Sequence, residues 1–265
     1  MIDVHCHLNF RAFKDDYDEV IKRAFEKGVT KIINVGTSIE SSEVAVELSK
    51  KYDNLYAIVG IHPHHADKLE KGWEEKINKL CKEPKVLAIG EIGIDYYSYK
   101  SNGIVNPKLQ KEVFVKQIKI ASKNKLPLQI HSRHAGKDII ETLTSHKDLL
   151  MQYPGMFHCF AGDMDYLKKA LSLGFCIGFD GNITYKGLAP GEDTLLSDLA
   201  KTTPVDRLVV ETDAPYLTPE PKRSSRNEPS YAIITADFIA KLKGITLEEL
   251  DKKTTENVYR IFNIK

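Results

Sequence analysis

Two histidines stand one residue apart at the start of the chain, in the segment Asp3-Val4-His5-Cys6-His7. This segment is predicted to be a strand, whose side chains alternate between two faces. His5 and His7 then point to the same side, and Cys6 points to the other. Two imidazoles on one face at the end of a strand are typical ligands of a transition metal. A complete metal site would need more ligands at the ends of other strands.

Further side chains of the metal-binding types follow several other predicted strands. They are His62 and His64 after the third strand, Glu91 after the fourth, His131 after the fifth, His158 after the sixth and Asp213 after the eighth. A carboxylate can bind two ions through its two oxygens, so this set predicts a site for two divalent cations. The expected ligands of one ion are His5, His7, Glu91 and Asp213, and those of the other are Glu91, His131 and His158.

The same residues suggest roles in hydrolysis. Asp213 is expected to accept the proton of an attacking water, unless it is a ligand only. Glu91 is expected to bridge the ions. His62 is expected to contact a phosphate or protonate the leaving oxygen, or else to bond a loop carbonyl, and His64 is a weaker candidate for contact with the substrate. The planar fork of Arg133 suits a phosphate, with an ion pair to a nearby acid as the alternative.

The rest of the chain predicts a scaffold that gathers strand ends. Short apolar runs rich in Val and Ile alternate with helix-like runs, which predicts an α/β protein with a (β/α)8 TIM barrel spanning residues 1–265 as a single domain. An open doubly wound sheet is the alternative, but no Gly-x-Gly-x-x-Gly follows a strand. The predicted strands are Ile2–His5, Lys31–Val35, Leu55–Gly60, Val86–Gly90, Leu128–His131, Gly155–His158, Phe175–Gly178 and Leu208–Glu211.

Helical patterns fill the intervals between these strands. The predicted helices are Asp15–Lys27, Ser41–Tyr52, Trp73–Lys82, Pro107–Lys123, Ala135–Thr144, Met164–Leu173 and Thr194–Lys201, followed by Pro229–Leu242 and a short helix that begins at Thr246–Leu250. In a TIM barrel the loops that follow the strands build the active site. The metal-binding side chains stand where this architecture requires them.

Composition narrows the class of protein. The chain has 38 Lys and Arg against 37 Asp and Glu, a net charge of +1, so any nucleic-acid footprint should be small. The basic residues Lys222, Arg223 and Arg226 could follow a nucleic-acid backbone, although a solvated basic loop is the more common interpretation of such a cluster. The four cysteines show no C-x-x-C spacing, which is typical of reduced cytosolic thiols. With no signal peptide and no membrane-length apolar run, we expect a cytoplasmic protein without an obligate protein partner.

Taken together, the motifs resemble the TatD family of metal-dependent deoxyribonucleases. The segments that carry the resemblance are Asp3–His7, Gly60-Ile61-His62-Pro63-His64, Gly90–Tyr97, Ile130–Arg133, His158–Gly162, Glu211–Leu217 and Asn257 within Thr254–Asn257. The resemblance covers the whole chain and implies a TIM-barrel hydrolase related to the amidohydrolases, with DNA phosphodiesters as the usual substrate. The metal ligands of the family fall on the same six residues assigned above. His134 departs from the pattern, since relatives often carry an acid there.

The leading hypothesis is therefore a metal-dependent deoxyribonuclease that acts on single-stranded DNA or strand ends. Its two divalent cations are zinc, manganese, nickel, iron or magnesium. One alternative keeps the metals and changes the bond: an amidohydrolase or esterase for a small carbonyl substrate or an aminoacyl-tRNA. Many relatives with carbonyl substrates carry a carboxylated lysine at the fourth strand, where this chain has Glu91, which favours phosphoesters. A non-catalytic binding protein on a barrel scaffold is the third alternative.

Overall fold

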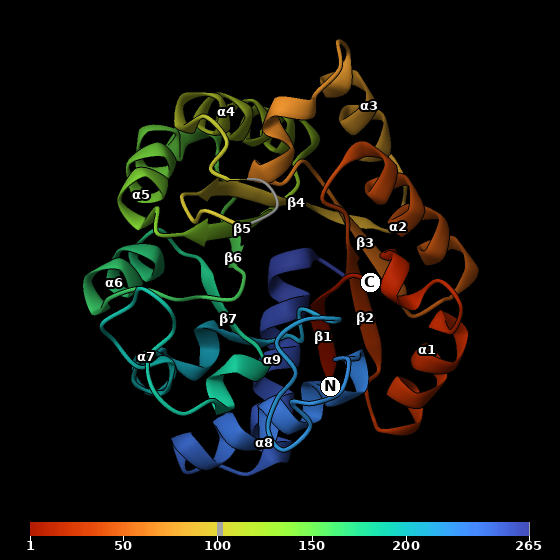
Figure 1. The fold of residues 1–265 in the computed structure, drawn as a ribbon, viewed down its shortest axis with the longest axis vertical. Coiled ribbons are helices and arrows are strands. Elements are labelled where there is room, and N and C mark those ends of the chain that lie inside the picture. The colour runs from red at the N-terminus through yellow and green to blue at the C-terminus, as the bar shows by residue number, and fades with distance from the viewer. Residues whose placement is uncertain (100–102, 265) are drawn as a thin grey trace.

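The computed structural model describes residues 1–99 and 103–264. Within these ranges, eight strands form one parallel sheet in the order of the sequence, and helices surround them (Figure 1). The strands are β1 (Ile2–Cys6), β2 (Lys31–Val35), β3 (Leu55–Val59), β4 (Val86–Asp95), β5 (Leu128–Arg133), β6 (Gly155–Phe157), β7 (Cys176–Phe179) and β8 (Leu208–Val210). The predicted (β/α)8 barrel is confirmed.

A helix follows each strand, and a ninth ends the described chain. The helices are α1 (Tyr17–Glu26), α2 (Ile39–Lys51), α3 (Trp73–Leu80), α4 (Pro107–Asn124), α5 (Gly136–Ser145), α6 (Met164–Ser172), α7 (Leu196–Thr202), α8 (Ala232–Lys243) and α9 (Leu247–Phe262). Local sequence signals set several ends. Asn106 caps α4 ahead of Pro107, and Gly244 ends α8 in the left-handed region. No helix of the described residues is long and apolar enough to cross a membrane.

Two elements are longer than the sequence predicts. Strand β4 continues past Gly90 to Asp95, and its pairing with β5 shifts register between Ile89 and Ile92. Glycine at position 93, at φ +149°, permits this path, because a Cβ there would lie 1.9 Å from the carbonyl oxygen of His131. The short helix predicted at Thr246 is wrong. Helix α9 has 16 residues, since its apolar face continues to Phe262 and is buried.

The barrel closes through irregular contacts between β8 and β1. Cys6 forms an isolated bridge with Ala214. The amide of His7 donates to Ala214 O at 2.8 Å, and the amide of Asp213 donates to His5 O at 2.9 Å. The closure therefore sets the end of β1 directly against the segment that follows β8.

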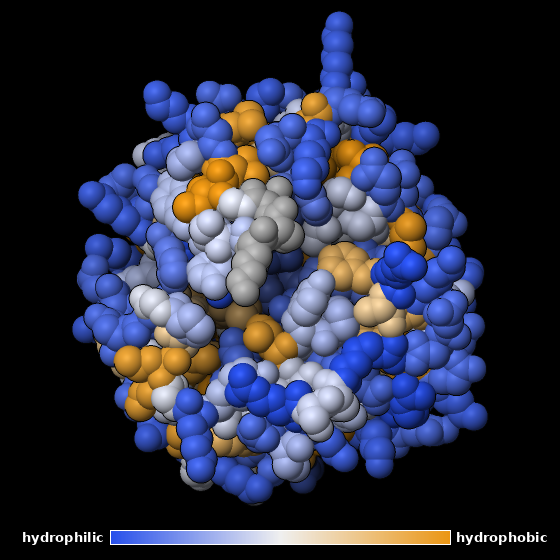
Figure 2. Space-filling view, in the orientation of Figure 1, coloured by the Kyte–Doolittle hydropathy of each residue, from blue (hydrophilic) through white to orange (hydrophobic). Residues whose placement is uncertain are grey.

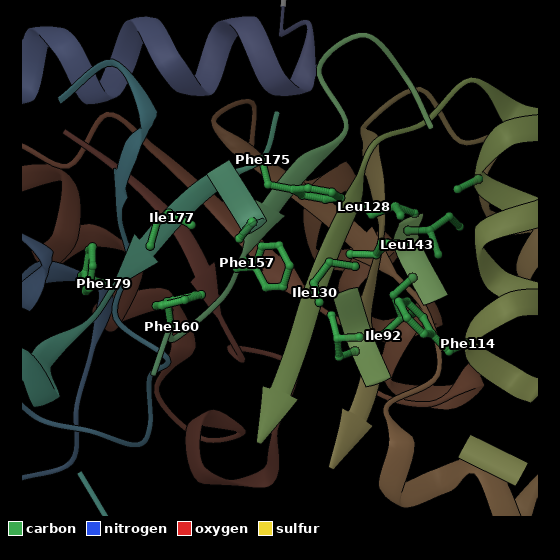
Figure 3. Close-up of a cluster of buried hydrophobic side chains, with 14 of the residues drawn as sticks. Ile92, Phe114, Leu128, Ile130, Leu143, Phe157, Phe160, Phe175, Ile177 and Phe179 are labelled. Atoms are coloured by element: carbon green, nitrogen blue, oxygen red, sulfur yellow. The ribbon is translucent and has the colours of Figure 1, made fainter. Parts of the chain in front are cut away.

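Apolar side chains fill both the barrel and the layer between strands and helices. The outer layer includes Ile92, Phe114, Ile130 and Phe157, which lie between strands and helices in Figure 3. A second cluster joins side chains from strands around the ring to the end of α9, and its members include Ile2, Ile33, Ile58, Ala88, Met156, Val209 and Phe262. A cluster drawn from strands all round the sheet must occupy the barrel interior. Full burial of each such side chain contributes about 1.5–3 kcal/mol.

The carboxyl ends of the strands surround a cavity of about 870 Å³. Figure 2 shows it as a hollow at the centre of the molecular face, bordered by hydrophilic side chains with hydrophobic ones between them. The residues that line it include eight predicted site residues: His7, His62, His64, Glu91, His131, Arg133, His158 and Asp213. The parallel sheet has thus brought residues more than 200 positions apart to one place.

Candidate metal centre

The first group of possible ligands comes from β1 and the segment after β8. His5 Nε2 and His7 Nε2 lie 3.1 Å apart. Asp213 Oδ1 lies 3.6 Å from His5 Nε2 and 3.3 Å from His7 Nε2. These three side chains can hold a metal ion. As predicted, His5 and His7 point to the same side, while Cys6 turns away and packs with residues of α1.

The second group comes from β4, β5 and the end of β6. His131 Nδ1 lies 2.6 Å from Glu91 Oε1, and His158 Nε2 lies 3.7 Å from the same oxygen. Glu91, His131 and His158 can also hold a metal ion. The two groups are adjacent, since the rings of His5 and His158 are stacked with their centroids 3.5 Å apart.

Glu91 divides its two carboxylate oxygens between the groups. Oε1 faces His131 and His158, whereas Oε2 lies 3.7 Å from His5 Nε2 and 3.9 Å from His7 Nε2. The residue is 4% exposed, so water contributes little to its solvation. Burial opposes its negative charge, yet the surrounding histidines, led by His62 and His131, hold the pKa of Glu91 well below its ordinary value. One carboxylate thus offers a separate oxygen to each nitrogen cluster.

Neutral groups orient the histidines of the first group. His7 Nδ1 lies 2.9 Å from Val35 O, so it donates a proton there and leaves Nε2 with a free lone pair. Gln129 lies beside His5 and crosses the barrel from β5, where its Nε2 donates to Val4 O at 2.9 Å. His5 Nδ1 and Gln129 Oε1 are both buried without a hydrogen-bond partner among the described residues. A carbonyl therefore sets the ring of His7, whereas the amide beside His5 forms no hydrogen bond with it among the described contacts.

Buried carboxylates orient the histidines of the second group. His131 Nε2 lies 3.1 Å from Asp95 Oδ2, and His158 Nδ1 lies 3.0 Å from Glu211 Oε2. Both acids are fully buried. Glycine at position 178 makes room for Glu211, because a Cβ there would lie 2.5 Å from its Oε1. A carboxylate behind a ligand imidazole fixes the ring and strengthens its donor nitrogen.

The different surroundings shift the pKa values of these histidines in opposite directions. Burial lowers the pKa of His5 well below its usual value, because the charged ring would lose its solvation. The same burial acts on His131, but the charge of Glu91 and the hydrogen bond with Asp95 outweigh it and raise the pKa to about 9. For His158, Glu211 and Glu91 outweigh burial and raise the pKa to about 10.

The donor atoms suit divalent cations. Imidazole nitrogens and carboxylate oxygens converge within 4.8 Å of one another in each group, in surroundings that are mostly buried. His7 presents a lone pair to the site because its other nitrogen is occupied, and His158 turns its Nε2 toward the site because Nδ1 faces Glu211, although a cation must displace the proton on that nitrogen at neutral pH. Cations with a preference for nitrogen and oxygen ligands would satisfy lone pairs that otherwise face one another.

Hydrogen bonds at the barrel seam position Asp213. Asp3 accepts from the Thr212 amide at 3.0 Å and from its hydroxyl at 2.7 Å. Asp213 itself has a φ of +53°, a left-handed conformation that Asp tolerates better than most residues. Asp3 thus holds the segment that carries Asp213 and contacts the backbone of His5. No contact between Asp3 and a ligand imidazole is found among the described residues.

His62 and His64 lie on the other side of the second group, at the start of a 3-10 helix (Pro63–Lys68). The amide of His64 donates to His62 Nδ1 at 3.1 Å. The neutral ring of His62 therefore carries its proton on Nε2, which lies 3.6 Å from Glu91 Oε1. His64 Nε2 lies 3.1 Å from Asp95 Oδ2. Of the two, His62 presents an N–H to Glu91, and the bond to a loop carbonyl considered for it is absent from the described contacts.

Arg133 lines the cavity but makes no ion pair among the described residues. Its guanidinium carbon lies 3.9 Å from the ring centre of Tyr97, and its Nη1 donates to Tyr99 Oη at 2.8 Å.

The two arginines of the basic loop after β8 have different surroundings. Arg226 pairs with Asp16 at 2.6 Å, whereas Arg223 lines the cavity. The ion pair thus holds Arg226 at the surface, whereas Arg223 remains at the cavity without a carboxylate partner among the described residues.

Two residues that matter for the geometry were not among the predicted site residues. Asp95 and Glu211 stand behind His131 and His158, although both lie within the motifs that carry the family resemblance. Their positions at strand ends, four residues after Glu91 and two before Asp213, are a signal that was available. That signal was not specific, because a strand end does not tell which histidine a carboxylate will reach.

Comparisons with known proteins agree with this geometry. A sequence profile of the family described as TatD related DNase matches residues 2–263. The chain is 38% identical over 265 residues to the uncharacterized metal-dependent hydrolase YabD of Bacillus subtilis, covering 100% of this chain and 99% of that protein. It is 34% identical over 271 residues to the 3'-5' ssDNA/RNA exonuclease TatD of Enterobacter lignolyticus, with coverage of 100% and 99%. The crystal structure of YjjV, a TatD homologue from Escherichia coli K12, superposes with a TM-score of 0.90 at 28% identity, covering 100% of this chain and 98% of that one.

Proposed function

This chain belongs to the family of TatD-related DNases and is a metal-dependent hydrolase of nucleic-acid ester bonds, and from that premise we propose that it hydrolyses single-stranded DNA near strand ends at a centre of two divalent cations. The proposed ligands of the first cation are His5, His7, Glu91 and Asp213. Those of the second are Glu91, His131 and His158. Zinc, manganese, nickel and iron suit the nitrogen-rich set, and magnesium can serve when it is abundant.

The observation that carries the proposal is the orientation of Glu91. Its Oε1 faces one pair of histidines and its Oε2 faces the other pair, at distances of 2.6–3.9 Å. A carboxylate that bound a single cation would need to face only one of these two pairs of histidines. The arrangement therefore favours a shared ligand between two ions.

The residues of the chain have separate tasks in this proposal. When bound, two divalent cations neutralise the charge that builds up on a phosphate and lower the pKa of water. Asp213, at the edge of the cavity, accepts the proton of the attacking water. His62 donates its Nε2 proton toward a phosphate oxygen or the leaving oxygen, since its Nδ1 is occupied by the amide of His64. The buried walls around Glu91 and His158 limit bulk water at the reacting bond.

The shape of the site favours a single strand over a duplex. The candidate ligands lie at the bottom of the cavity and are mostly buried, so a scissile phosphate must enter the barrel mouth. An unpaired strand can do this without opening base pairs. Tyr99, Tyr185 and Tyr216 line the walls and offer rings on which unpaired bases can stack. The name of the Enterobacter relative, a 3'-5' ssDNA/RNA exonuclease, also supports this substrate.

A metal-titrated assay on end-labelled single-stranded and duplex DNA tests the proposal. We expect release of nucleotides that needs added divalent metal, is faster on single strands and is abolished by Glu91→Ala. His146→Ala is the matched control, since His146 lies at the end of α5 and contacts Thr142 O. Full activity of Glu91→Ala with metal present would rule out the shared-ligand centre. No cleavage of DNA beside rapid hydrolysis of a lactone or an aminoacyl-tRNA would favour the carbonyl alternative.

A further inference from the structure

Two arginines at the cavity wall are each stacked on a tyrosine. Arg133 stands at the end of β5. Its guanidinium carbon lies 3.9 Å from the ring centre of Tyr97, and its Nη1 donates to Tyr99 Oη. Arg223 stands in the segment after β8, and its guanidinium carbon lies 3.6 Å from the ring centre of Tyr185. Tyr185 is itself fixed, because its hydroxyl donates to Thr218 O at 2.9 Å. Both guanidinium planes are therefore held in place by neutral groups.

Neither of these arginines has a carboxylate within 4 Å in the described parts of the chain, although other arginines do. Arg226, only three residues beyond Arg223, is bound by Asp16 at 2.6 Å, and Arg23 is bound by Glu228 at 2.8 Å. The two arginines that line the cavity thus have no carboxylate partner in these parts of the chain, and their charge is left available to a ligand. A fixed cation without an anionic partner is an efficient binding site for one.

The stacked arrangement leaves the edges of both guanidinium groups open. A guanidinium has five N–H donors in its plane, and within residues 1–99 and 103–264 Arg133 uses only one of them in a hydrogen bond, at Nη1. A ring contact to the guanidinium carbon uses none of the N–H donors, with which a phosphate forms two parallel hydrogen bonds. The geometry therefore suits phosphate better than an aromatic or neutral ligand.

The two arginines follow different strands of the barrel, and candidate metal ligands stand on both arcs of the ring that separate these strands. Arg133 follows β5 and Arg223 follows β8, three strands further on in the ring. Both line the same cavity of about 870 Å³, which is at the upper end of the range for pockets that bury a drug-sized molecule, roughly 300–1,000 Å³. There is room for a strand that extends to both sides of the bond being cleaved.

We propose that Arg133 and Arg223 bind the two phosphates that flank the scissile phosphate, one on each side. This inference rests on the proposed nuclease function and adds a requirement to it. The substrate is a strand with at least three consecutive phosphates, so the released end must itself carry a phosphate for full activity. Tyr97 and Tyr185 are positioning residues that hold the guanidinium planes.

The proposal predicts a strong dependence on substrate length and on terminal phosphates. In the metal-loaded enzyme, thymidine tetranucleotides phosphorylated at both ends should be cleaved with a kcat/KM about tenfold to a hundredfold above that of the thymidine dinucleotide, which has one phosphate. Products identified by mass spectrometry show which bond is cleaved first. The position of that bond identifies the two phosphates on either side of it, which are then replaced one at a time.

Neutral methylphosphonate linkages then test each contact separately. Replacing either neighbouring phosphate should lower kcat/KM of the wild type about tenfold or more. In Arg133→Ala, a methylphosphonate at the phosphate that Arg133 binds should lower kcat/KM little further, while a methylphosphonate at the other neighbouring phosphate should keep its full effect. In Arg223→Ala, the two positions should exchange these behaviours. Binding of the same strands, followed by fluorescence anisotropy, supplies a readout that needs no turnover. Arg133→Lys and Arg223→Lys, which keep charge and lose the planar fork, should fall in between.

Lys222→Ala is the matched control, because Lys222 is exposed beside Arg223 and lies outside the cavity lining. It removes the same charge and should leave all rates within about twofold. The inference would be overturned if each methylphosphonate lowered kcat/KM in both arginine variants as much as in the wild type. It would also be overturned if the arginine variants cleaved unmodified strands at the wild-type rate. Absence of cleavage of unmodified DNA by the wild type would instead contradict the proposed nuclease function.

Discussion

His5 and His158 are stacked ring on ring, yet they belong to two differently built halves of the site. Their centroids are 3.5 Å apart and their planes differ by 15°. Behind His5 is the amide of Gln129, whereas behind His158 is the buried carboxylate of Glu211. The pKa of His5 is well below its usual value because of burial, while Glu211 and Glu91 raise the pKa of His158 to about 10 against the effect of burial.

The difference shows that the partner behind an imidazole matters more than burial alone. His5 and His158 are both at most 5% exposed, so burial by itself would shift them alike. Each histidine of the second group has a backing carboxylate at hydrogen-bond distance, whereas among the described contacts His7 bonds a carbonyl and the Nδ1 of His5 bonds no group. A carboxylate-backed imidazole is the stronger electron donor. We therefore expect the cation at His131 and His158 to be held more tightly than the cation at His5 and His7.

Glu91→Gln should produce the largest effect, because it removes the charge that the two halves share. The amide keeps the shape of the side chain but offers one oxygen instead of two. We expect a loss of nuclease activity of about a thousandfold or more, with at most one equivalent of metal retained. Activity assays and elemental analysis of the purified variant provide the two measurements. Retention of two equivalents would show that the halves do not depend on a common ligand.

Asp95→Asn and Glu211→Gln should weaken the second half alone. Each removes the charge behind one histidine and leaves the candidate ligands in place. We expect about a tenfold to hundredfold loss in affinity for the more tightly bound cation, measured by calorimetric titration with zinc or manganese. The weaker phase of the titration should stay unchanged. Equal weakening of both phases would mean that the halves are not separate.

Metal binding should depend on pH differently in the two halves. In the metal-free protein His131 and His158 have pKa values of about 9 and about 10, so at neutral pH both rings carry protons that a cation must displace. Affinity at the second half should therefore rise with pH, by about tenfold per pH unit for each proton displaced, until the pH reaches these values. The pKa of His5 is lowered, so its ring is already neutral and adds no such slope.

Calorimetry in two buffers of different ionisation enthalpy counts the released protons. We expect more protons to be released when the tightly bound cation binds than when the weaker one binds. An equal number for the two cations would remove the electrostatic distinction between the halves.

Gln129→Met should have the smallest effect of the set. Methionine has a similar size and removes the amide near His5, which was a neutral partner to begin with. We expect less than about a tenfold loss of affinity in the weaker phase and a decrease of about 1–2 kcal/mol in the free energy of unfolding, because Val4 O loses its donor. Chemical denaturation and metal titration measure the two quantities. A loss as large as that of Glu211→Gln would contradict the contrast between neutral and charged partners.

Much of the fold follows directly from local patterns. Short apolar runs alternate with amphipathic ones, and the barrel with its strand order agrees with that pattern. Boundaries were less predictable where packing extends an element. Strand β4 runs on to Asp95 because it pairs with β5 beyond a register shift, and α9 extends to Phe262 because its apolar face packs against the barrel. Neither partner is adjacent in sequence, so neither extension has a local signal.

The arginines show the same limit at the level of single side chains. Arg223 and Arg226 are of one type, three positions apart in one loop, and no sequence rule separates them. Asp16 neutralises Arg226 from the region before α1, while Tyr185 holds Arg223 at the cavity from the segment after β7. Their different surroundings come from chain segments that the fold brings together.

By itself, the sequence determined which residues gather at the barrel mouth. Parallel strands place all their carboxyl ends on one side, so His5, Glu91 and His158 had to meet once the strands were identified. Only the tertiary structure decided how these residues face one another: that the oxygens of Glu91 divide between two pairs of histidines, and that Asp95 and Glu211 stand behind one pair only. The physical reason is that strand order fixes the neighbourhood, whereas side-chain packing fixes distances of a few ångströms, on which ligand geometry and charge depend.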